Sequence, residues 1–144
     1  LISSNSASMG TSTEYVQALL GGDEAAAAAI AQTTDAQMVY SGTKQALTLW
    51  MKRNAPTYAT QGIRINALAP GLIKTPLSDA IQNDPVYGEA VKLFADSIPM
   101  GRQGLPDDIA PAASFLLSEK ASFISGSVLY IDGGHDALFR PEQI

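Results

Sequence analysis

The sequence predicts an α/β fold, on three observations. Residues 63–69 alternate apolar and polar side chains as a strand does, and residues 127–131 form a second short apolar run. Residues 38–58 carry apolar side chains three and four positions apart, which is typical of a helix buried on one side. Residues 1–4 have the composition of the end of a further strand. Strands that alternate with helices are typical of a sheet covered by helices.

Composition excludes several classes of protein. With 46% hydrophobic and 16% charged residues, the chain has enough apolar side chains for a folded core. The net charge is −5 and no basic cluster is longer than Lys52-Arg53, so we expect neither nucleic acid nor membrane as a partner. No run approaches the roughly 20 apolar residues that a membrane-spanning helix needs. The absence of cysteine excludes disulfides and thiolate metal sites and fits the cytoplasm, and we expect no metal site.

In the first third of the chain, the sequence predicts a loop and, further along, a short helix. Gly10 to Thr13 has the composition of a loop, and Gly21-Gly22 marks the end of a helix. Asp23 is a good N-cap for a helix from Glu24 to Gln32. The alanine run in this segment favours a helix, because alanine has the highest helix propensity.

The helix expected at 38–58 should bury one face and be interrupted near its end. We expect Trp50 to lie in the core rather than at a ligand. Pro56 removes a backbone hydrogen bond and clashes with the preceding turn, so the helix should kink or end there. The strand at 63–69 should end sharply at Pro70-Gly71. The apolar positions that define the buried face of the helix are Val39, Ala46, Leu47, Trp50 and Met51.

Residues 71–100 are predicted to form two short helices. Thr75 before Pro76 is a good helix start, and Asn83-Asp-Pro85 interrupts the segment. Interrupted segments beside a site are often mobile, so we interpret residues 71–100 as a substrate-binding lid. Its apolar side chains would either face a hydrophobic substrate or pack on the body of the protein. These side chains are Leu72, Leu77, Ile81, Val91, Phe94 and Met100.

A helix and a strand are predicted near the C-terminus. Pro106 opens the helix, with Asp107-Asp108 in the first turn where the helix dipole favours acids. Residues 127–131 form the last strand. His135 is the only histidine, and without evident partners for a metal or general-base role we expect it to lie at the surface or in C-terminal packing. The side of the helix expected to be buried is formed by Ile109, Ala113, Leu116 and Leu117.

Tyr40 and Lys44 form the candidate catalytic pair. Residues four apart on a helix lie on one face, about 5 to 6 Å apart at Cβ, so the Lys44 ammonium can lie beside the Tyr40 phenol. A nearby positive charge favours a phenolate, which suits a tyrosine that exchanges a proton with a carbonyl or alcohol oxygen. The spacing alone is a weak signal, because exposed helices often carry such pairs for solubility.

The order of the motifs around this pair resembles the catalytic, C-terminal half of the short-chain dehydrogenase/reductase family. The resemblance covers essentially the whole chain. It implies the C-terminal half of a Rossmann-like doubly wound parallel sheet with flanking helices. The motifs that carry it are Ile2-Ser3-Ser4, Tyr40-Ser-Gly-Thr-Lys44, Gly62-Ile-Arg-Ile-Asn66, Pro70-Gly71, Thr75-Pro76 and Ile131-Asp-Gly-Gly134.

The chain differs from most of this family between Ser4 and Tyr40. The two residues lie 36 positions apart, a much longer gap than most relatives have, so we interpret residues 5–37 as an insert. The bacterial 3α-hydroxysteroid dehydrogenase/carbonyl reductase group carries a similar insert, and the sequence is most similar to that group. The insert would lie beside the mouth of the active site or over the flank where relatives pair.

The resemblance implies a role for each motif. Tyr40 would exchange a proton with the substrate oxygen, Lys44 would support Tyr40 and bind the cofactor ribose, and Ser4 would hydrogen-bond the substrate oxygen. Ser4, rather than Ser3 or Ser6, matches the second serine of the family pattern. The expected cofactor-binding residues are Tyr40, Lys44, Pro70, Gly71, Ile73 and Thr75. The expected substrate-contacting residues are Ser4, Ser6, Leu72 and Pro76.

The implied cofactor is NAD, with NADP left open, because the resembled steroid dehydrogenases use NAD. The backbone near Ile73 and the hydroxyl of Thr75 would hold its nicotinamide carboxamide. The sequence contains no glycine-rich turn with the spacing and context needed at a dinucleotide pyrophosphate. We therefore interpret residues 1–144 as the catalytic half of a single dinucleotide-binding domain without its N-terminal cofactor-binding half. By itself this half should not bind a nicotinamide cofactor with useful affinity.

The sequence thus predicts an enzyme that transfers a hydride between a nicotinamide cofactor and a secondary alcohol or ketone, such as a hydroxysteroid or another hydrophobic carbonyl compound. A homodimer is expected by analogy with relatives, in which the last helix and strand pair with their copies. Two alternatives remain open: a noncatalytic remnant that acts as a dimerising scaffold, and an epimerase or dehydratase with bound nicotinamide. The generic apolar residues of the lid do not identify the natural substrate.

Overall fold

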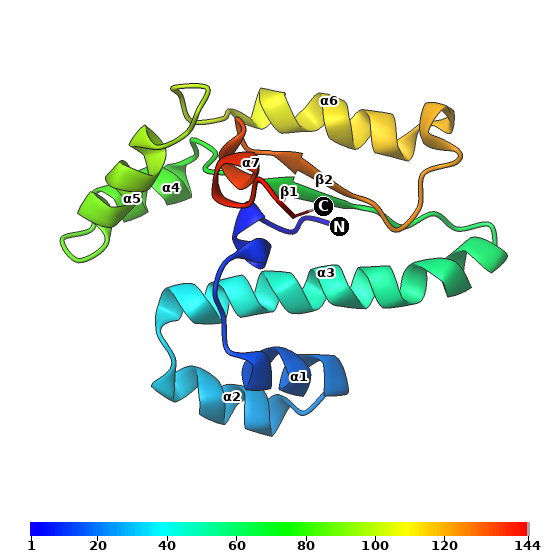
Figure 1. Cartoon of the computed structure of the whole chain (residues 1–144), viewed down its shortest axis with the longest axis horizontal. Coiled ribbons are helices and arrows are strands. Elements are labelled where there is room, and N and C mark those ends of the chain that lie inside the picture. Colours follow the sequence, from blue (N-terminus) through cyan, green and yellow to red (C-terminus); the bar gives the residue numbers. More distant parts are fainter. Residues whose placement is uncertain (144) are drawn as a thin grey trace.

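The computed structural model describes residues 1–143 and has the predicted α/β architecture. Figure 1 shows the sheet between α3 on one face and α6 on the other, with α1 and α2 in a further layer beyond α3. Across residues 1–143, every helix is too short or too polar to cross a bilayer. The elements in chain order are η1 (Asn5–Ser8), α1 (Thr13–Gly21), α2 (Glu24–Thr33), α3 (Ala36–Thr60), β1 (Ala67–Pro70), α4 (Pro76–Gln82), α5 (Gly88–Asp96), α6 (Pro106–Leu117), η2 (Glu119–Ala121), β2 (Val128–Ile131) and α7 (His135–Phe139).

Two parallel strands form the sheet, and the first residues of the chain lie along its edge. β1 pairs with β2 in register from Ala67↔Val128 to Pro70↔Ile131, and β2 starts one residue later than predicted. On the other side of β1, Ile2 forms a parallel bridge with Leu68. The carboxyl ends of all three segments therefore meet at one edge of the sheet. η1, α7 and the loop into α4 lie at this carboxyl edge (Figure 1).

The long helix α3 extends beyond the predicted 38–58 at both ends. Its start is fixed by the Asp35 carboxylate, which accepts two backbone hydrogen bonds from the first turn. Pro56 lies inside the helix, so of the two outcomes expected at this proline, a kink or an end, the helix does not end there. The last turns bend away from the axis of the preceding ones, as expected where proline removes a backbone hydrogen bond (Figure 1).

Trp50 does not lie in the core, which corrects the sequence prediction. The residue is 41% exposed, and its ring centroid lies 6.3 Å from that of Tyr58. The buried positions of this stretch of α3 are Ala46, Met51 and Ala55. Trp50 precedes Met51 by one residue, which turns it about 100° around the helix and off the buried face.

The strand predicted at 63–69 is also shorter than expected. β1 spans only Ala67–Pro70, and the residues before it are held largely by side-chain hydrogen bonds, with a backbone bond from Gly126 N to the carbonyl of Ile65 at 2.8 Å. Asn66 Nδ2 donates to the carbonyl of Ile124 at 2.9 Å, and Arg64 Nη1 donates to the same carbonyl at 3.2 Å. β1 itself is buried on both faces rather than alternating, because α3 and α6 cover the sheet.

Two helices of the second half begin where predicted. α4 starts at Pro76, and its N-cap Thr75 accepts a hydrogen bond from Ser78 N at 3.2 Å. α6 starts at Pro106. Leu117, predicted to be buried, is 84% exposed, and no residue of α6 is fully buried. The reason is that α6 lies over only two short strands, so its apolar face extends beyond the surface beneath it.

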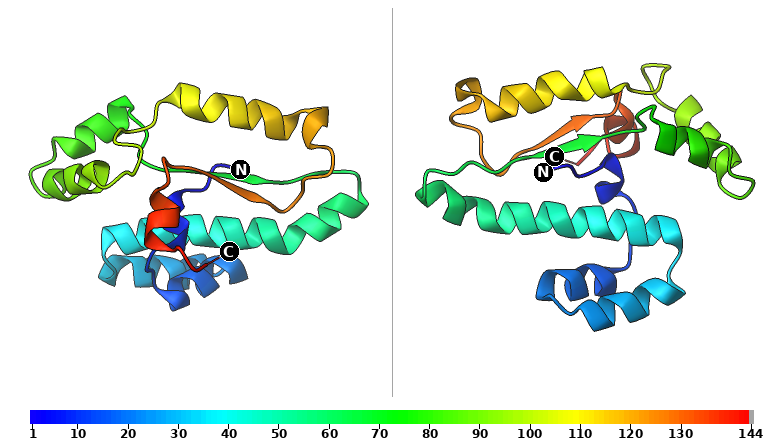
Figure 2. Two further views of the ribbon diagram at one scale, coloured as in Figure 1. Left: turned by 45° about the horizontal axis from the view of Figure 1, so that its top comes forward. Right: turned by 180° about the vertical axis from the view of Figure 1, so that it is seen from behind.

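α4 and α5 form an arm that projects beyond the carboxyl edge of the sheet (Figures 1 and 2). We call residues 76–96 the arm. The predicted interruption at Asn83-Asp-Pro85 separates its two helices. Among the apolar side chains of the expected lid, Leu72, Val91 and Phe94 are half-buried. Of the same set, Leu77, Ile81 and Met100 are exposed, and so are three further residues of the arm, Val86, Tyr87 and Leu93.

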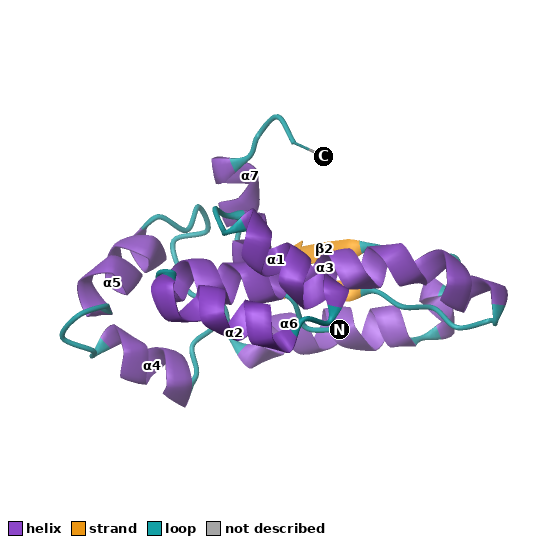
Figure 3. Cartoon of the chain, turned by 90° about the horizontal axis from the view of Figure 1, so that it is seen from below, coloured by secondary structure: helices purple, strands orange, loops and turns teal. Residues whose placement is uncertain are grey.

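α1 and α2 lie within residues 5–37, the segment interpreted as an insert, and α1 packs on α3 (Figure 3). The predicted helix end at Gly22 is present, with φ of +74° in the left-handed region. Asp23 caps α2 by accepting from Ala26 N at 2.9 Å. The insert covers the face of α3 that points away from the sheet (Figure 2).

Gly42, between the two candidate catalytic residues of α3, allows this packing. A Cβ at residue 42 would lie 2.5 Å from Thr11 Oγ1 and 2.7 Å from Tyr15 Cδ1. The Tyr15 hydroxyl also lies 3.2 Å from Thr43 Oγ1. The motif that carries Tyr40 and Lys44 is therefore held on one side by α1, because glycine leaves room for the α1 side chains.

Candidate active site

The predicted site segments meet at the carboxyl edge of the sheet. Ser4 follows the edge segment that pairs with β1, Pro70 is the last residue of β1, and Gly71 follows it. η1 packs on α3, the helix that carries Tyr40 (Figure 1). Residues that are far apart in the sequence are thus brought to one end of the molecule.

Tyr40 and Lys44 lie on the same face of α3. Lys44 Nζ is 5.7 Å from the centroid of the Tyr40 ring, within the range of a cation–π interaction. Lys44 also donates to the carbonyl of Ile2 at 3.2 Å, which joins it to the edge segment that leads to Ser4. Tyr40 is 47% exposed, so it is open to a ligand.

Ser4 is buried at the N-cap of η1 with a defined hydrogen-bond polarity. Its Oγ accepts from Ser6 N at 3.2 Å and from Ser6 Oγ at 2.9 Å. Because both bonds are donated to Ser4, its own hydroxyl hydrogen is free to donate to a ligand oxygen. Ser6, expected to contact substrate directly, is itself buried and bonded to Ser4.

Ser3 has a different environment, which favours Ser4 as the candidate. Ser3 Oγ lies 2.6 Å from Thr48 Oγ1 of α3 and 3.4 Å from the carbonyl of Lys44. Its hydroxyl is therefore used in packing the edge segment on α3. Consecutive side chains of an extended segment point to opposite sides, so Ser4 is directed away from this contact.

Gly71 follows β1 and lies close to Asp132, the residue that follows β2. A Cβ at residue 71 would lie 2.7 Å from Asp132 Cβ and 2.8 Å from Asp132 Cα. Only glycine fits at this distance without a shift of the backbone. Gly71 N also donates to the carbonyl of Ile131 at 3.0 Å, which extends the ladder past Pro70.

The segment after Gly71 is fixed by backbone pairing. Ile73 forms a parallel bridge with Gly104, and Lys74 N donates to the Gly104 carbonyl at 2.8 Å. The Thr75 hydroxyl is occupied as the cap of α4, where it accepts from Ser78 N. A hydroxyl oxygen accepts two hydrogen bonds, so capping leaves Thr75 with capacity for a ligand.

A cavity of about 440 Å³ lies beside these residues and is lined in part by Leu72 and Ile73. None of the three catalytic candidates lines it. Its polar wall contains the ion pair between Arg102 and Asp108, with Nη1 and Oδ2 2.7 Å apart. The Arg102 guanidinium and a backbone N–H hold the pKa of Asp108 well below its usual range. Pro76, the other expected substrate contact, is exposed at the start of α4.

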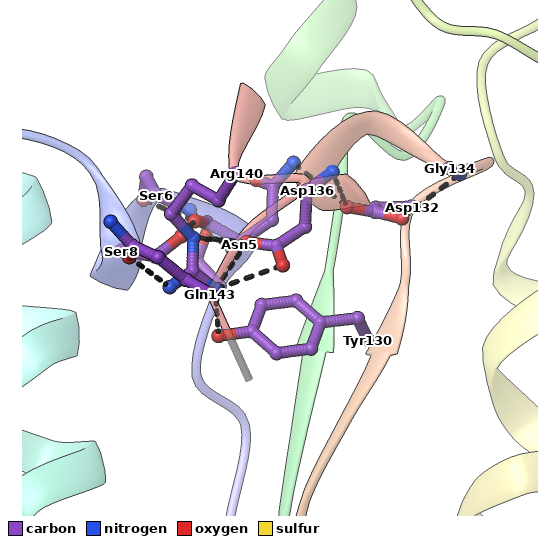
Figure 4. Close-up of polar contacts among 10 residues, drawn as sticks. Asn5, Ser6, Ser8, Tyr130, Asp132, Gly134, Asp136, Arg140 and Gln143 are labelled. Carbon is purple, nitrogen blue, oxygen red and sulfur yellow. Dashed lines mark hydrogen bonds and ion pairs between the residues drawn. The ribbon is translucent and has the colours of Figure 1, made fainter. Parts of the chain in front are cut away.

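A group of polar residues near the C-terminus was not found from the sequence. We call Asn5, Ser8, Asp132, Asp136 and Arg140 the C-terminal polar cluster (Figure 4). It joins η1 to the end of β2 and to α7: Ser8 Oγ donates to Asp136 Oδ1 at 2.8 Å, and Asp132 Oδ2 accepts from Asp136 N at 2.6 Å. The only sequence signal was the Asp132-Gly-Gly motif, which does not reveal the contacts with residues 5 and 8.

His135 is a packing residue, in agreement with the second of its two expected placements. It is fully buried, with its ring centroid 4.2 Å from that of Phe94 and 4.6 Å from that of Phe139. Its Nε2 lies 2.8 Å from Ser97 Oγ, whereas its buried Nδ1 has no hydrogen-bond partner among residues 1–143. Burial lowers the pKa of His135, and the carboxylate of Asp132 opposes part of that shift. The described residues contain no group of three or more acidic, histidine or cysteine side chains placed to hold a metal.

Comparison with known proteins gives a consistent set of relatives. Residues 24–136 match the family described as Enoyl-(Acyl carrier protein) reductase. The chain is 41% identical over 129 residues to the 3-alpha-hydroxysteroid dehydrogenase/carbonyl reductase of Comamonas testosteroni, an alignment that covers 88% of this chain and 49% of that protein. It is 41% identical over 95 residues to 3beta-hydroxysteroid dehydrogenase 1 of Eggerthella lenta, with 66% and 35% covered.

A solved structure extends the similarity to the fold. The crystal structure of the 3-alpha-hydroxysteroid dehydrogenase from Pseudomonas sp. B-0831 complexed with NADH superposes with a TM-score of 0.92 at 41% sequence identity. The match covers 99% of this chain and 57% of that one. The chain thus spans about half the length, or less, of the curated relatives named above.

Proposed function

The chain belongs to the short-chain dehydrogenase/reductase family, and on this premise we propose that it supplies the catalytic residues of an oxidoreductase. The reaction is the transfer of a hydride between a nicotinamide cofactor and a secondary alcohol or ketone. The observation that carries the proposal is the exposed Tyr40–Lys44 pair, 5.7 Å from ammonium to ring centroid. Lys44 also donates a hydrogen bond to Ile2, two residues before Ser4, so the pair and the serine are held on connected segments.

The residues present fit the ribose and nicotinamide end of such a cofactor. Lys44 has three N–H donors and uses one on the carbonyl of Ile2, which leaves donors for ribose hydroxyls. Gly71, which packs against Asp132, has no side chain and so exposes its backbone at the carboxyl edge, where ligands of open α/β sheets bind. Ile73 and Thr75 continue this segment and would hold the carboxamide. The relative from Pseudomonas sp. B-0831 is described as complexed with NADH, which supports NAD, with NADP left open.

The proposed mechanism assigns each of three residues one task. During reduction the Tyr40 hydroxyl gives its proton to the carbonyl oxygen, and during oxidation the Tyr40 phenolate takes the proton from the alcohol. The Lys44 ammonium stabilises that phenolate. Ser4 donates its free O–H to the same substrate oxygen, where negative charge develops during reduction. The cofactor, when bound, supplies or accepts the hydride.

We further propose a hydrophobic alcohol or carbonyl compound as substrate, with hydroxysteroids as the leading class. Two relatives carry hydroxysteroid dehydrogenase names, and the arm presents exposed apolar side chains near the site. We propose residues 71–100 as the lid and a homodimer as the assembly. The dimer is supported by exposed apolar residues on α6 and β2, such as Phe115, Leu117 and Leu129. A cytoplasmic location fits a chain without cysteine.

The relatives favour redox chemistry over the two alternatives considered from the sequence. The names of the two curated relatives above are those of dehydrogenases or reductases, and neither names an epimerase or a dehydratase. A dimerising scaffold would not need the free O–H of Ser4 or the exposed Tyr40–Lys44 pair.

The test is an assay of the protein in its intact isolated form, with hydroxysteroids, cyclic alcohols and ketones and with either nicotinamide cofactor. Intact mass is measured first, since a mass above 15.1 kDa shows that residues 1–144 are only part of the molecule. We expect absorbance of the reduced cofactor to change with turnover, and Tyr40→Phe to lower kcat by about 10²- to 10⁴-fold, the usual contribution of a general acid or base.

The control is Tyr58→Phe, which removes a phenolic oxygen near the other end of α3. It should leave kcat unchanged. Near-normal turnover by Tyr40→Phe would overturn the assignment of the proton donor. Turnover without net change in reduced cofactor would instead favour an epimerase or dehydratase.

A further inference from the structure

We propose that Asp136 and Asp132 are positioning residues for Ser4, and that they act by clamping the serine turn, residues 4–8, to the C-terminal end of the molecule. The inference rests on the oxidoreductase function proposed above and deepens it. Neither carboxylate contacts Ser4 itself. Their effect passes through hydrogen bonds that join residues more than a hundred positions apart in the sequence (Figure 4).

The first link joins Ser8, at the end of the turn, to Asp136 on α7. Ser8 Oγ lies 2.8 Å from Asp136 Oδ1 and 2.7 Å from the carbonyl of Asn5. One hydroxyl hydrogen serves both acceptors, and the charged carboxylate is the stronger of the two. The turn is therefore held by a charge-assisted bond to a different element rather than by its own backbone alone.

Asp136 is itself fixed by a guanidinium. Arg140 Nη2 lies 2.8 Å from both Asp136 oxygens, and Arg140 Nε lies 3.0 Å from Oδ1. Arg140 Nη2 also donates to the Tyr130 hydroxyl at 3.1 Å. Both side chains of the pair are largely buried, with 22% and 15% of their surface exposed. The carboxylate that holds Ser8 is thus oriented by a planar, multiply bonded partner.

The second link is Asp132, at the carboxyl end of β2. Its Oδ2 accepts from Asp136 N at 2.6 Å and its Oδ1 accepts from Gly134 N at 3.1 Å, so it holds the backbone at the start of α7. Asn5 Nδ2 lies 3.5 Å from Asp132 Oδ2, a long and weak contact. Asp132 also packs against Gly71, the start of the segment expected to contact the cofactor. Asp132 therefore acts on the serine turn mainly through Asp136, whose backbone N–H it binds.

The turn transmits this position to Ser4. Ser4 Oγ is oriented by two donors on Ser6, its backbone N–H and its hydroxyl, and Ser6 lies two residues before the clamped Ser8. A shift of the far end of the turn moves both donors, and with them the direction of the free Ser4 O–H. A fixed donor stabilises developing charge better than a mobile one, because no reorganisation is needed during the reaction.

The experiment compares Ser8→Ala, Asp136→Asn and Asp136→Ala in the intact protein, with Ser114→Ala on the exposed side of α6 as the matched serine control. The readouts are kcat, KM for cofactor and substrate, and hydrogen exchange of residues 4–8. We expect Ser8→Ala to lower kcat about tenfold, the effect of one hydrogen bond, with KM for the cofactor unchanged and faster exchange of the turn. Asp136→Asn keeps an acceptor for Ser8 and should lose less activity than Asp136→Ala.

The outcomes separate this inference from the proposed function. Unchanged kcat and unchanged exchange in Ser8→Ala and Asp136→Ala, in a protein that transfers hydride, would overturn the clamp and leave the function standing. A lack of hydride transfer in the unsubstituted protein would overturn the function and the catalytic role of the clamp together. If Asp136→Ala does not fold, Ser8→Ala decides the matter, because it deletes only one oxygen at a half-buried position.

Discussion

The serine turn and the arm lie at the same edge of the sheet but are held in opposite ways. Residues 3–7 are all buried. The side chains of Asn5 and Ser8 bond to Asp132 and Asp136, which lie 127 and 128 positions further along the chain. The arm exposes Leu77 at 72%, Val86 at 75% and Leu93 at 65%. Its side-chain hydrogen bonds are mostly local, such as that from Asn83 Nδ2 to the carbonyl of Asp79 at 2.7 Å.

This difference matches two requirements of the proposed reaction. A group that donates a hydrogen bond to the reacting oxygen must keep one direction, and long-range bonds to packed elements provide that. A segment that closes over a substrate must change its contacts, and local hydrogen bonds remain intact while such a segment moves. The two regions therefore suit the fixed and the adaptable sides of one site.

Gly71→Ala should have the largest effect on stability, because the end of β1 packs directly against Asp132, a residue of the clamp on the serine turn. The new Cβ would lie 2.7 Å from Asp132 Cβ and 2.8 Å from Asp132 Cα, and the backbone must shift to relieve the contact. We expect the free energy of unfolding to fall by about 1–3 kcal/mol, the usual cost of overpacking. Denaturant unfolding of the variant measures this change.

The matched control is Gly21→Ala, at the last residue of α1, where a Cβ meets no atom within 4 Å. It should be neutral or up to about 1 kcal/mol stabilising, since alanine is the better helix former. Equal effects of the two substitutions would show that the end of β1 is not tightly packed against Asp132. Tight packing at this edge of the sheet would then be limited to the serine turn itself.

The sequence predicts local features of the fold better than it predicts burial. Signals that act within a few residues were correct: Asp23 and Thr75 cap their helices and Gly22 ends one. Burial was predicted less well, as Trp50 and Leu117 show, because exposure depends on which elements cover a face and not on helical spacing alone.

The contacts of the serine turn were beyond the reach of sequence patterns. Ser8 and Asp136 are common polar residues without periodic spacing, and they meet only because parallel pairing brings the ends of distant segments to one edge. Ser4 was placed by a family motif. The partner that orients Ser4, its neighbour Ser6, was expected to contact substrate, because a hydrogen bond within a turn depends on backbone geometry that the motif does not state.

His135 joins the two regions, and its titration gives a smaller, pH-dependent effect. The histidine bonds Ser97 at the end of α5, while its neighbour Asp136 holds the serine turn. Burial lowers the pKa of His135 from its ordinary 6.5 in the folded state, so the folded protein binds fewer protons than the unfolded one below that pH. The free energy of unfolding should therefore fall as the pH drops from about 6.5 through the folded pKa, and then level off.

Denaturant unfolding at a series of pH values, with His135→Phe beside the unsubstituted protein, measures this effect. The phenylalanine variant cannot titrate, so its stability should stay flatter between pH 6.5 and the onset of carboxylate titration near 4. An unchanged pH slope in His135→Phe would assign the dependence to other groups. His135 would then be a neutral packing residue with no titration of its own in this range.

Leu77→Ala should have the smallest effect on stability and tests the adaptable side of the site. Leu77 is 72% exposed on α4, so its truncation removes little buried surface, and the free energy of unfolding should change by less than about 0.5 kcal/mol. If the arm closes over a hydrophobic substrate, Leu77 becomes buried in the complex. KM for such a substrate should then rise, by up to about tenfold, since losing apolar contact in a pocket costs on the order of 1–3 kcal/mol.

Steady-state kinetics with a hydroxysteroid and with a small ketone separate this contact from a general loss of activity. The small ketone should show little change, because it does not reach the arm. Ile63→Ala is the matched control, since Ile63 is also exposed, at 46%, but lies before β1 and away from the carboxyl edge. A KM for the steroid that rises in Ile63→Ala and not in Leu77→Ala would mean that the arm does not cover the substrate, and its exposed apolar side chains would need another partner.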